Sequence, residues 1–549
     1  MANAGEPAAG RQRIGLVVTA SAAGTMFEWY DFFIYGSVAP IIARHFFAGA
    51  GETQGYILTL LTFAAGFFAR PFGAVVFGRL GDRTGRKRTF LVTITVMGLA
   101  TFLAGLLPDA SMIGNLAPWL LVALRVAQGF AIGGEYGGAA IYVAEHTPAR
   151  GRGFSTGWIQ LSASIGLILA LGVILVLQNA MGEKTFADWG WRVPFLLSAI
   201  LLAISLWIRL RLEESPLFQR IRDEGRLAKA PLSEALLEPA NLKVVLIVLV
   251  GLLMGQGVVW YLAQFYTLFF LQHVLKLDLG MTTALIMGMT LITLPFYLFF
   301  SWLSDKIGRK PVMLAGMCVA AIATFPIFHG LTESVNPALA SAAAKAPVLV
   351  VAAPRDCSVQ FNLTGTAKFV SSCDIAKSAL AGAGIPYRNR EAPEGTFAHV
   401  KIGLADVASP DGRNMRAGEL AAAKKDFDVR LKAALTAAGY PQMANSGAVD
   451  IGRTLLLLTI LGVAAAALYA PQAAALVELF PTRIRYTALS VPYHIGVGWF
   501  GGFLPATAFA IVAATGNIYA GLWYPVIVAA VGFFVSLLLL PETYKRAID

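Results

Sequence analysis

Charged side chains inside long apolar segments are the first candidates for chemistry in this chain. The apolar segment 14–42 contains Glu28-Trp29-Tyr30-Asp31, and because Glu28 and Asp31 are three positions apart they share one helix face. A charge inside a membrane span costs at least about 2.5–3.5 kcal/mol on insertion scales, so such residues are functional candidates by default. We predict that Asp31 and Glu28 take part in proton coupling.

A second charged group lies in the apolar segment 116–143. Arg125 is followed by Gln128 after three positions and by Glu135 after seven more, which again places them on one helix face. If the two segments cross a membrane in opposite directions, Asp31 and Arg125 reach similar depths.

We therefore predict that Arg125 binds a substrate carboxylate or holds Asp31, with Gln128 and Tyr30 as further substrate ligands and Glu135 as another proton site. The alternative is a static salt bridge that only fixes helix packing. Glu135 could equally be a structural residue of its glycine-rich stretch.

Polar and aromatic residues in the second half of the chain complete the predicted substrate site. They can donate hydrogen bonds to a small polar solute or form a cation–π wall for an ammonium group. Most aromatic side chains in membrane spans only pack or anchor the helix at the interface. The candidates are Tyr261, Gln264, Gln256 and Tyr493.

One short motif occurs twice, as GRLGDRTGRK at 78–87 and SWLSDKIGRK at 301–310. Each copy joins two apolar segments, which indicates a duplicated membrane transporter. An aspartate that opens a helix can satisfy free N–H groups, and the basic residues can reach the other half. We predict that this motif gates the protein and does more than set its topology; the gating residues are Asp82, Arg83, Arg86, Asp305 and Arg309.

The composition is that of a membrane protein. Hydrophobic residues make up 57% of the 549 residues and charged residues only 14%, with a mean hydropathy of +0.66. Soluble domains carry about 25% charged residues, which disfavours a large soluble enzyme. The net charge of +11 gathers in loops of one face, as the positive-inside rule expects, so we predict no nucleic-acid binding and cytoplasmic termini.

Twelve apolar segments divide the chain into five parts. We expect an all-α polytopic protein with a six-helix bundle at 1–210, a cytoplasmic linker at 211–242 and a second bundle at 243–331 and 451–549. The polar stretch 332–450 is too long for a turn, and we predict a small extracytoplasmic α+β insert between helices 9 and 10. The spans are expected at 14–42, 54–78, 89–107, 116–143, 153–177, 191–210, 243–271, 282–303, 312–330, 452–477, 486–513 and 518–540.

Two of the three cysteines, Cys357 and Cys373, lie in this insert, and we predict a disulfide between them because an extracytoplasmic location favours oxidation. The sequence contains no phosphate-loop motif, no metal-spaced histidine cluster and no nucleophile–base arrangement. We therefore expect neither an enzyme nor a metal or cofactor.

The repeated loop motif resembles the signature of the major facilitator superfamily. Further stretches resemble its metabolite:H⁺ symporter family, which includes bacterial permeases for α-ketoglutarate, shikimate and citrate and the proline/betaine carriers. These are Glu28 to Phe32, Ala69 to Gly73, Arg125 to Glu135, Trp191 to Phe195, Glu214 to Pro216 and Phe480 to Arg485. The resemblance implies an inner-membrane importer of small organic acids or zwitterions, driven by the proton gradient, and we expect it to act as a monomer in the bilayer.

Two other functions stay open at this point. An exporter or antiporter of small molecules would favour an apolar site, and Arg125 argues against it. A membrane sensor could use the insert at 332–450 to bind a ligand, but the sequence contains no visible signalling domain.

Overall fold

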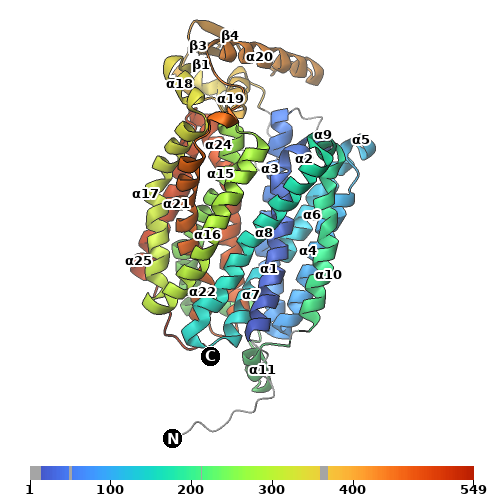
Figure 1. The fold of residues 1–549 in the computed structure, drawn as a ribbon, viewed down its shortest axis with the longest axis vertical. Coiled ribbons are helices and arrows are strands. Elements are labelled where there is room, and N and C mark those ends of the chain that lie inside the picture. The colour runs from blue at the N-terminus through green and yellow to red at the C-terminus, as the bar shows by residue number, and fades with distance from the viewer. Residues whose placement is uncertain (1–13, 48–51, 212, 359–368, 549) are drawn as a thin grey trace.

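The computed structural model describes residues 14–47, 52–211, 213–358 and 369–548 (Figure 1). Parts of the first predicted bundle, of the linker and of the insert therefore lie outside the described residues. Two groups of long helices stand side by side, and a small mixed unit, the insert, lies at one end above the C-terminal group. We call the end that carries the insert the insert end and the opposite end the network end.

The N-terminal half comprises the helices of residues 14–210. Its long helices are apolar over most of their surface, and the polar residues turn toward the interior of the bundle. These helices are α1 (Ile14–Ser37), α2 (Ala39–Phe46), α3 (Glu52–Thr84), α4 (Arg86–Leu106), α5 (Ala110–Ile113), α6 (Leu116–Ile132), α7 (Glu135–His146), α8 (Arg152–Met181), α9 (Glu183–Thr185) and α10 (Arg192–Leu210).

A linker with the short helices α11 (Pro216–Asp223) and α12 (Pro231–Leu236) leads to the C-terminal half. The first helix run of this half, 239–274, alternates between α and π geometry. Its segments are α13 (Pro239–Ile247), η4 (Val248–Leu253), α14 (Met254–Tyr261), η5 (Leu262–Tyr266), α15 (Thr267–Phe269) and η6 (Phe270–Val274). The remaining helices are α16 (Leu279–Ile307), α17 (Arg309–Val335), α21 (Ile451–Tyr469), α22 (Gln472–Leu479), α23 (Arg485–Tyr493), the π segment η9 (His494–Gly501), α24 (Leu504–Thr515) and α25 (Trp523–Leu539).

Eleven helical segments of the described chain are long and apolar enough to cross a membrane. They correspond to the second to twelfth predicted spans. The first predicted span forms α1, which has 24 residues but carries Glu28 and Asp31 and is not among the eleven. Helix α1 nevertheless packs inside the bundle against α7, α8 and α10.

The insert is an α+β unit with its own apolar core. Its four strands are ordered β2-β1-β3-β4, with β1 parallel to β2 and antiparallel to β3. Val348, Val400 and Phe427 are buried between this sheet and the helices. The elements are α18 (Pro337–Lys345), β1 (Val348–Ala352), α19 (Ser372–Gly382), β2 (Tyr387–Glu391), β3 (His399–Ile402), β4 (Ala405–Ala408) and α20 (Ala417–Ala437). A disulfide joins Cys357 and Cys373.

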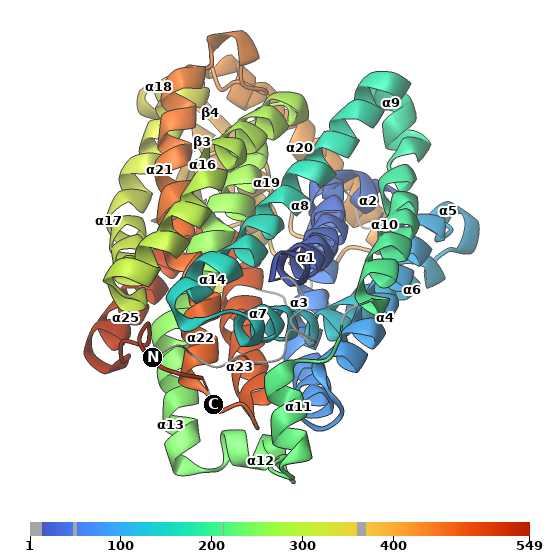
Figure 2. The same cartoon turned by 60° about the horizontal axis from the view of Figure 1, so that its bottom comes forward.

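The two halves meet along two seams. In one seam α3 packs against α23 and η9, and in the other α8 packs against α16. Figure 2 shows α7, α22 and α23 gathered where the halves meet at the network end. The candidate site residues therefore have to be located along these seams.

Candidate functional site

Glu28 and Asp31 both lie in the interior of the bundle. Their exposed fractions are 4% and 3%, and neither carboxylate is fully bonded. Glu28 Oε2 and Asp31 Oδ1 have no hydrogen-bond partner among the described residues. Because an unpaired buried carboxylate is costly, these two groups are the best placed in the N-terminal half to bind a proton or a ligand.

Glu135 forms an ion pair with a residue that the sequence analysis did not single out, Arg209 of α10. Thr93 Oγ1 also donates to Glu135 Oε2 at 2.8 Å. The Arg209 guanidinium lies against α1 at Gly24, where any side chain would collide with it, one helical turn from Glu28. Glu28 and Glu135 therefore both lie close to the Arg209 guanidinium. This arrangement favours a role for Glu135 that is at least partly structural.

Arg125 is buried, but no ion pair between Arg125 and Asp31 within 4 Å is found in the described part of the chain. Its guanidinium instead bonds Gln128 Oε1 and stacks on the Tyr35 ring at 4.1 Å. Gln128 in turn donates to Thr101 Oγ1 at 2.8 Å. This conformation therefore shows an Asp31–Arg125 ion pair neither as a static salt bridge nor as a contact by which Arg125 holds Asp31, and the role of Arg125 in binding a carboxylate stays a prediction.

Arg70 of α3 is a second buried cation that sequence reasoning missed. It is 4% exposed, and its guanidinium lies 4.2 Å from the Phe67 ring and 4.9 Å from the Phe32 ring. Its side chain also reaches Gly498 of η9 and so spans the seam between the halves. Arg70 Nε has no hydrogen-bond partner among the described residues. Charge inside a predicted span, the signal used for Arg125, would have identified it.

Aromatic rings of the two halves pack against each other near Arg70, and we call them the aromatic wall. Trp29 of α1 lies 4.9 Å from Trp260 of α14, measured between ring centroids, and Phe33 stacks on Phe265 at 5.0 Å. Nearer the network end, Tyr136 stacks on Tyr493 at 3.9 Å. The wall combines an apolar surface with π faces that suit a cation or a flat solute.

The structure brings together only some of the other predicted substrate ligands. Tyr261 is buried beside Phe67, and Gln256 lies on the same helix with an unpartnered amide oxygen in the described region. Gln264 receives a hydrogen bond from Thr290 at 3.4 Å. Tyr30 donates to the Pro194 carbonyl at 3.0 Å, inside the N-terminal half, so we do not carry it into the proposed site.

At the network end, Asp82 of the first motif caps a helix of the other half. Its carboxylate accepts hydrogen bonds from the backbone N–H groups of Tyr486 and Thr487, at 3.1 and 2.9 Å, and from Thr487 Oγ1 at 2.7 Å. These donors open α23, whose first N–H groups have no intrahelical partner and favour a negative charge.

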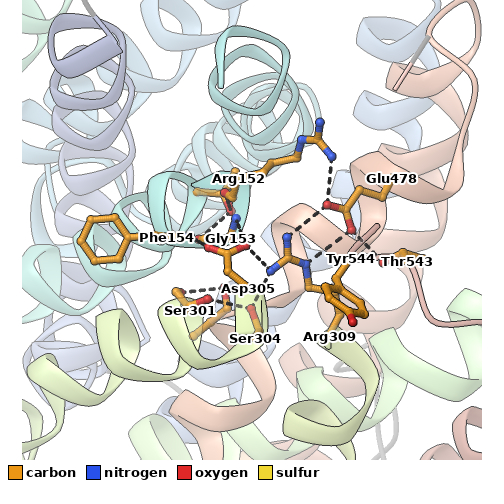
Figure 3. Close-up of polar contacts among 12 residues, drawn as sticks. Arg152, Gly153, Phe154, Ser301, Ser304, Asp305, Arg309, Glu478, Thr543 and Tyr544 are labelled. Carbon is orange, nitrogen blue, oxygen red and sulfur yellow. Dashed lines mark hydrogen bonds and ion pairs between the residues drawn. The ribbon is translucent and has the colours of Figure 1, made fainter. Parts of the chain in front are cut away.

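Asp305 of the second motif makes the corresponding contact in the opposite direction (Figure 3). Its carboxylate accepts from the N–H groups of Gly153 and Phe154, at 3.0 and 2.8 Å, at the start of α8. Each half thus caps a helix of the other half with the aspartate of its own motif.

The motif arginines extend both contacts into buried ion pairs. Arg309 pairs with Asp305 at 2.6 Å and with Glu478 at 3.2 Å, and Arg152 of the N-terminal half also reaches Glu478 at 3.0 Å. On the other side, Arg86 pairs with Asp82 at 3.6 Å and with Glu145 at 3.7 Å.

Three further contacts complete the symmetry. Arg485 of the C-terminal half contacts Glu145 at 2.8 Å. Glu214 and Glu542 accept from the backbone N–H groups of Arg86 and Arg309, at 3.0 and 2.9 Å. Among the predicted gating residues, only Arg83 is exposed. We call these two equivalent sets of contacts together the charge network. One set comprises Asp82, Arg86, Glu145 and Arg485, and the other comprises Asp305, Arg309, Glu478 and Arg152.

The site holds no recognisable metal centre. The described residues contain no group of three or more histidine, cysteine, aspartate or glutamate side chains placed to bind a metal ion.

Two helical halves that meet through a charge network at one end, with buried acids and cations in the interior, are typical of membrane transporters built from two similar bundles. The family described as sugar (and other) transporter matches residues 16–245. The chain is 38% identical over 317 residues to the shikimate transporter of Escherichia coli K12, covering 57% of this chain and 71% of the relative. This chain belongs to the sugar (and other) transporter family of the major facilitator superfamily, in agreement with the motif resemblance.

Other relatives are also transporters. The proline/betaine transporter of Escherichia coli K12 is 36% identical, with 58% of this chain and 65% of the relative covered, just under two thirds of its length. The α-ketoglutarate permease of the same strain is 32% identical, with 62% and 77% covered. The chain is accordingly a transporter and not an enzyme.

A solved structure of the proton:xylose symporter XylE, bound to 6-bromo-6-deoxy-D-glucose, superposes with a TM-score of 0.59. The alignment covers 97% of each chain, but only 16% of the residues are identical. This likeness establishes the fold and carries no information about the solute.

Replacing Asp82 with alanine is expected to open the network end. The change removes three hydrogen bonds to a charged group, and a net loss of about 2 kcal/mol would shift the population of open molecules about 30-fold. Spin labels at the exposed positions 150 and 306, in a Cys318→Ser background, report the separation of the halves.

The matched control is Arg83→Ala, because Arg83 is the exposed neighbour of Asp82 on the same helix. We expect longer label distances in Asp82→Ala and unchanged distances in Arg83→Ala. Identical distance distributions in the two variants would show that Asp82 does not hold the network end closed.

Proposed function

We propose that this protein is a proton-coupled secondary transporter that imports a small organic acid or zwitterion by alternating access. One observation carries the proposal. Two acids, Glu28 and Asp31, and two guanidinium groups, Arg70 and Arg125, are buried in the interior of the bundle. Each acid has a carboxylate oxygen without a partner in the described chain, and neither arginine forms an ion pair there. Buried charges that only stabilise a fold are normally paired.

The two cations favour a carboxylate as the group that is recognised. A guanidinium binds a carboxylate through two parallel hydrogen bonds, and neither Arg70 nor Arg125 forms an ion pair with a protein carboxylate within the described residues. Arg70 reaches both halves, so a solute bound there would contact the two bundles together. The aromatic wall of Trp29 and Trp260 suits the remainder of the solute.

Proton coupling follows from the charge balance of this cluster. With Glu28 and Asp31 ionised, the two acids and the two guanidinium groups cancel. Each proton that binds leaves one positive charge uncompensated, which attracts an anionic solute. By reciprocity, the bound anion then favours protonation. We therefore expect the solute to be an anionic carboxylate rather than a zwitterion, which has no net charge.

Alternating access needs a contact that holds one end closed and can be broken. The charge network supports this role because its ion pairs and helix caps cross between the halves at the network end. In this conformation the network is formed. We infer that proton and solute binding at the seam change the balance between this state and one in which the network end is open.

The remaining features of the proposal concern the membrane. We propose that α1 is the first of twelve spans, that the five predicted parts of the chain are its functional divisions, and that the network end with both termini faces the cytoplasm of a bacterial inner membrane. The carrier would work as a monomer, with the proton gradient in place of a cofactor. Across 100 mV one charge supplies about 2.3 kcal/mol, or about 50-fold accumulation per proton.

Uptake into proteoliposomes tests the function. We expect one of the anionic compounds in a panel of α-ketoglutarate, shikimate, citrate, proline and glycine betaine to accumulate under an imposed inward proton gradient. A protonophore should abolish the accumulation. Accumulation of betaine or proline alone would contradict the expectation of an anionic carboxylate, and outward transport alone would favour an exporter.

The same panel with Arg70→Ala tests the recognition of the carboxylate. Arg79 is exposed on the same helix, so Arg79→Ala is the matched control. We expect KM for the solute to rise at least tenfold in Arg70→Ala, since a charged hydrogen-bond pair is worth about 1.5–3 kcal/mol. Equal KM values in the two variants would exclude Arg70 from the substrate site.

Two substitutions test the coupling. Asp31→Asn removes a titratable group and Arg125→Ala removes a cation, and each is expected to abolish proton-driven accumulation while the protein is still made. Asp188→Asn, at an exposed position, serves as the control for loss of an acid. Normal accumulation in either variant would show that the residue is not needed for coupling.

Labelling tests the proposed orientation. Intact cells expressing Cys318→Ser protein would be treated with a membrane-impermeant reductant and then with a membrane-impermeant maleimide. If the insert is extracytoplasmic, Cys357 and Cys373 become labelled without permeabilisation. Labelling that appears only after the cells are permeabilised would place the insert in the cytoplasm.

A further inference from the structure

The helix run 239–274 is interrupted more often than the other long helices of the bundle. Three π segments, η4, η5 and η6, break its α geometry, and η6 ends at Val274 directly below the insert. A π segment disturbs the regular i to i−4 hydrogen bonding and is a usual place for a helix to bend. The insert end of this helix therefore has the local structure of a movable element.

One side of the insert forms hydrogen bonds with the C-terminus of α24. The N–H of Tyr387 donates to the Gly516 carbonyl at 2.8 Å, and its hydroxyl donates to the Ala513 carbonyl. Asn389 Nδ2 donates to the carbonyls of Ala514 and Thr515, both at 3.2 Å. The last carbonyls of a helix have no intrahelical donor, so the insert supplies what α24 lacks.

A second side of the insert forms hydrogen bonds with the chain immediately after η6. Lys276 Nζ donates to the Gly382 carbonyl at 3.0 Å, and the Lys276 carbonyl accepts from the N–H of Ala444 at 2.9 Å. Asn336 Nδ2 donates to the Leu275 carbonyl at 2.9 Å. These contacts come from three separate parts of the insert.

Asp278, which caps α16, adds a fourth contact to this joint. Ser446 donates its hydroxyl to Asp278 at 2.5 Å. Burial raises the pKa of this carboxyl, but the hydroxyl and the backbone N–H of Met281 outweigh burial and hold the pKa below its ordinary value. The carboxylate therefore remains an acceptor down to acidic pH.

A glycine makes each joint possible. Gly516 has a φ of +77°, and a Cβ there would lie 2.2 Å from the Tyr387 carbonyl oxygen. Gly384 has a φ of +68°, and a Cβ there would lie 2.6 Å from the carbonyl oxygens of both His273 and Val274. Because the obstructing atoms are backbone atoms, neither joint can admit even a methyl group without separating.

We propose that the insert is a staple that fastens the insert end of the helix 239–274 to the C-terminus of α24, so that both helix ends move as one body. The insert has its own buried core and two separate joints, so it can transmit restraint from one joint to the other. Helix α24 also packs directly against η5, so the staple adds to that contact by fixing the chain after η6. The inference does not depend on which solute is carried.

Hydrogen exchange of the full-length protein in nanodiscs tests the staple. In Gly516→Ala we expect peptides covering 270–282, at the distant joint, to exchange at least about fivefold faster, because a staple fails when either joint fails. Gly384→Ala should in the same way accelerate exchange at 508–520. The readout is exchange, so a failed transport assay and a failed staple can be told apart.

Gly439→Ala is the matched control. Gly439 follows α20 with a φ of +83° and has open space where the methyl group would be, so the substitution imposes a similar backbone cost away from both joints. We expect normal exchange at 270–282 and at 508–520 in this variant. Acceleration confined to the joint that carries each substitution, or equal acceleration in Gly439→Ala, would overturn the proposal.

If Gly516→Ala cannot be purified, Asn389→Ala replaces it. This substitution removes two hydrogen bonds to α24 without adding an atom or straining the backbone. Faster exchange at 270–282 would support the staple, and unchanged exchange there together with faster exchange at 508–520 would reject it.

Discussion

The cost of placing an ionised group in a medium of low dielectric governs this structure. At the network end that cost is met almost completely: Asp82 accepts three hydrogen bonds in addition to its contact with Arg86, and Glu478 is shared by Arg309 and Arg152. Around Arg70 and Arg125 it is not met, because neither forms an ion pair among the described residues, and Glu28 Oε2 and Asp31 Oδ1 lack hydrogen-bond partners there. The difference separates charges that hold a conformation from charges that are available to bind.

The charge network also explains why the motif occurs twice. One copy could cap a helix within its own half, and that contact would not depend on how the halves are arranged. Here the aspartate of each copy caps a helix of the opposite half, so both caps require the halves to be closed together. Because each cap is accompanied by buried ion pairs, separating the halves breaks two equivalent sets of contacts at once. The network end should therefore open cooperatively.

Periodicity and charge were enough to predict much of this arrangement from the sequence. The apolar segments correspond to the helices, the repeated motif contained Asp82 and Asp305, and the stretch 332–450 contains both strands and helices as expected. These features are local, so spacing along the chain specifies them. Pairing across helices is not local, and here sequence reasoning failed: Asp31 and Arg125 share a depth, but Arg125 turns to Gln128 and Tyr35.

Two buried arginines were missed for a different reason, because the rule was not applied to every charged residue. Arg70 and Arg209 lie inside predicted spans, and the rule applied to Arg125 would have identified both. Tyr30 differs, because its place beside Asp31 in the sequence suggested a ligand and its hydroxyl donates to the Pro194 carbonyl, so its role in substrate binding stays a prediction. Neighbouring residues on a helix point about 100° apart, so adjacency in sequence says little about a shared site.

The two ends of the molecule are restrained by different means, and this asymmetry has a mechanical consequence. Ion pairs and helix caps at the network end connect the two halves, so under the proposed alternating access they would break and form again in each cycle. The joints of the insert connect elements within the C-terminal half, α24 and the chain after η6, so they can stay intact throughout. A helix with three π segments would ordinarily absorb part of the motion by bending. If its insert end is fixed to α24, more of the motion must be taken up where the halves meet, which is where the unpaired charges lie.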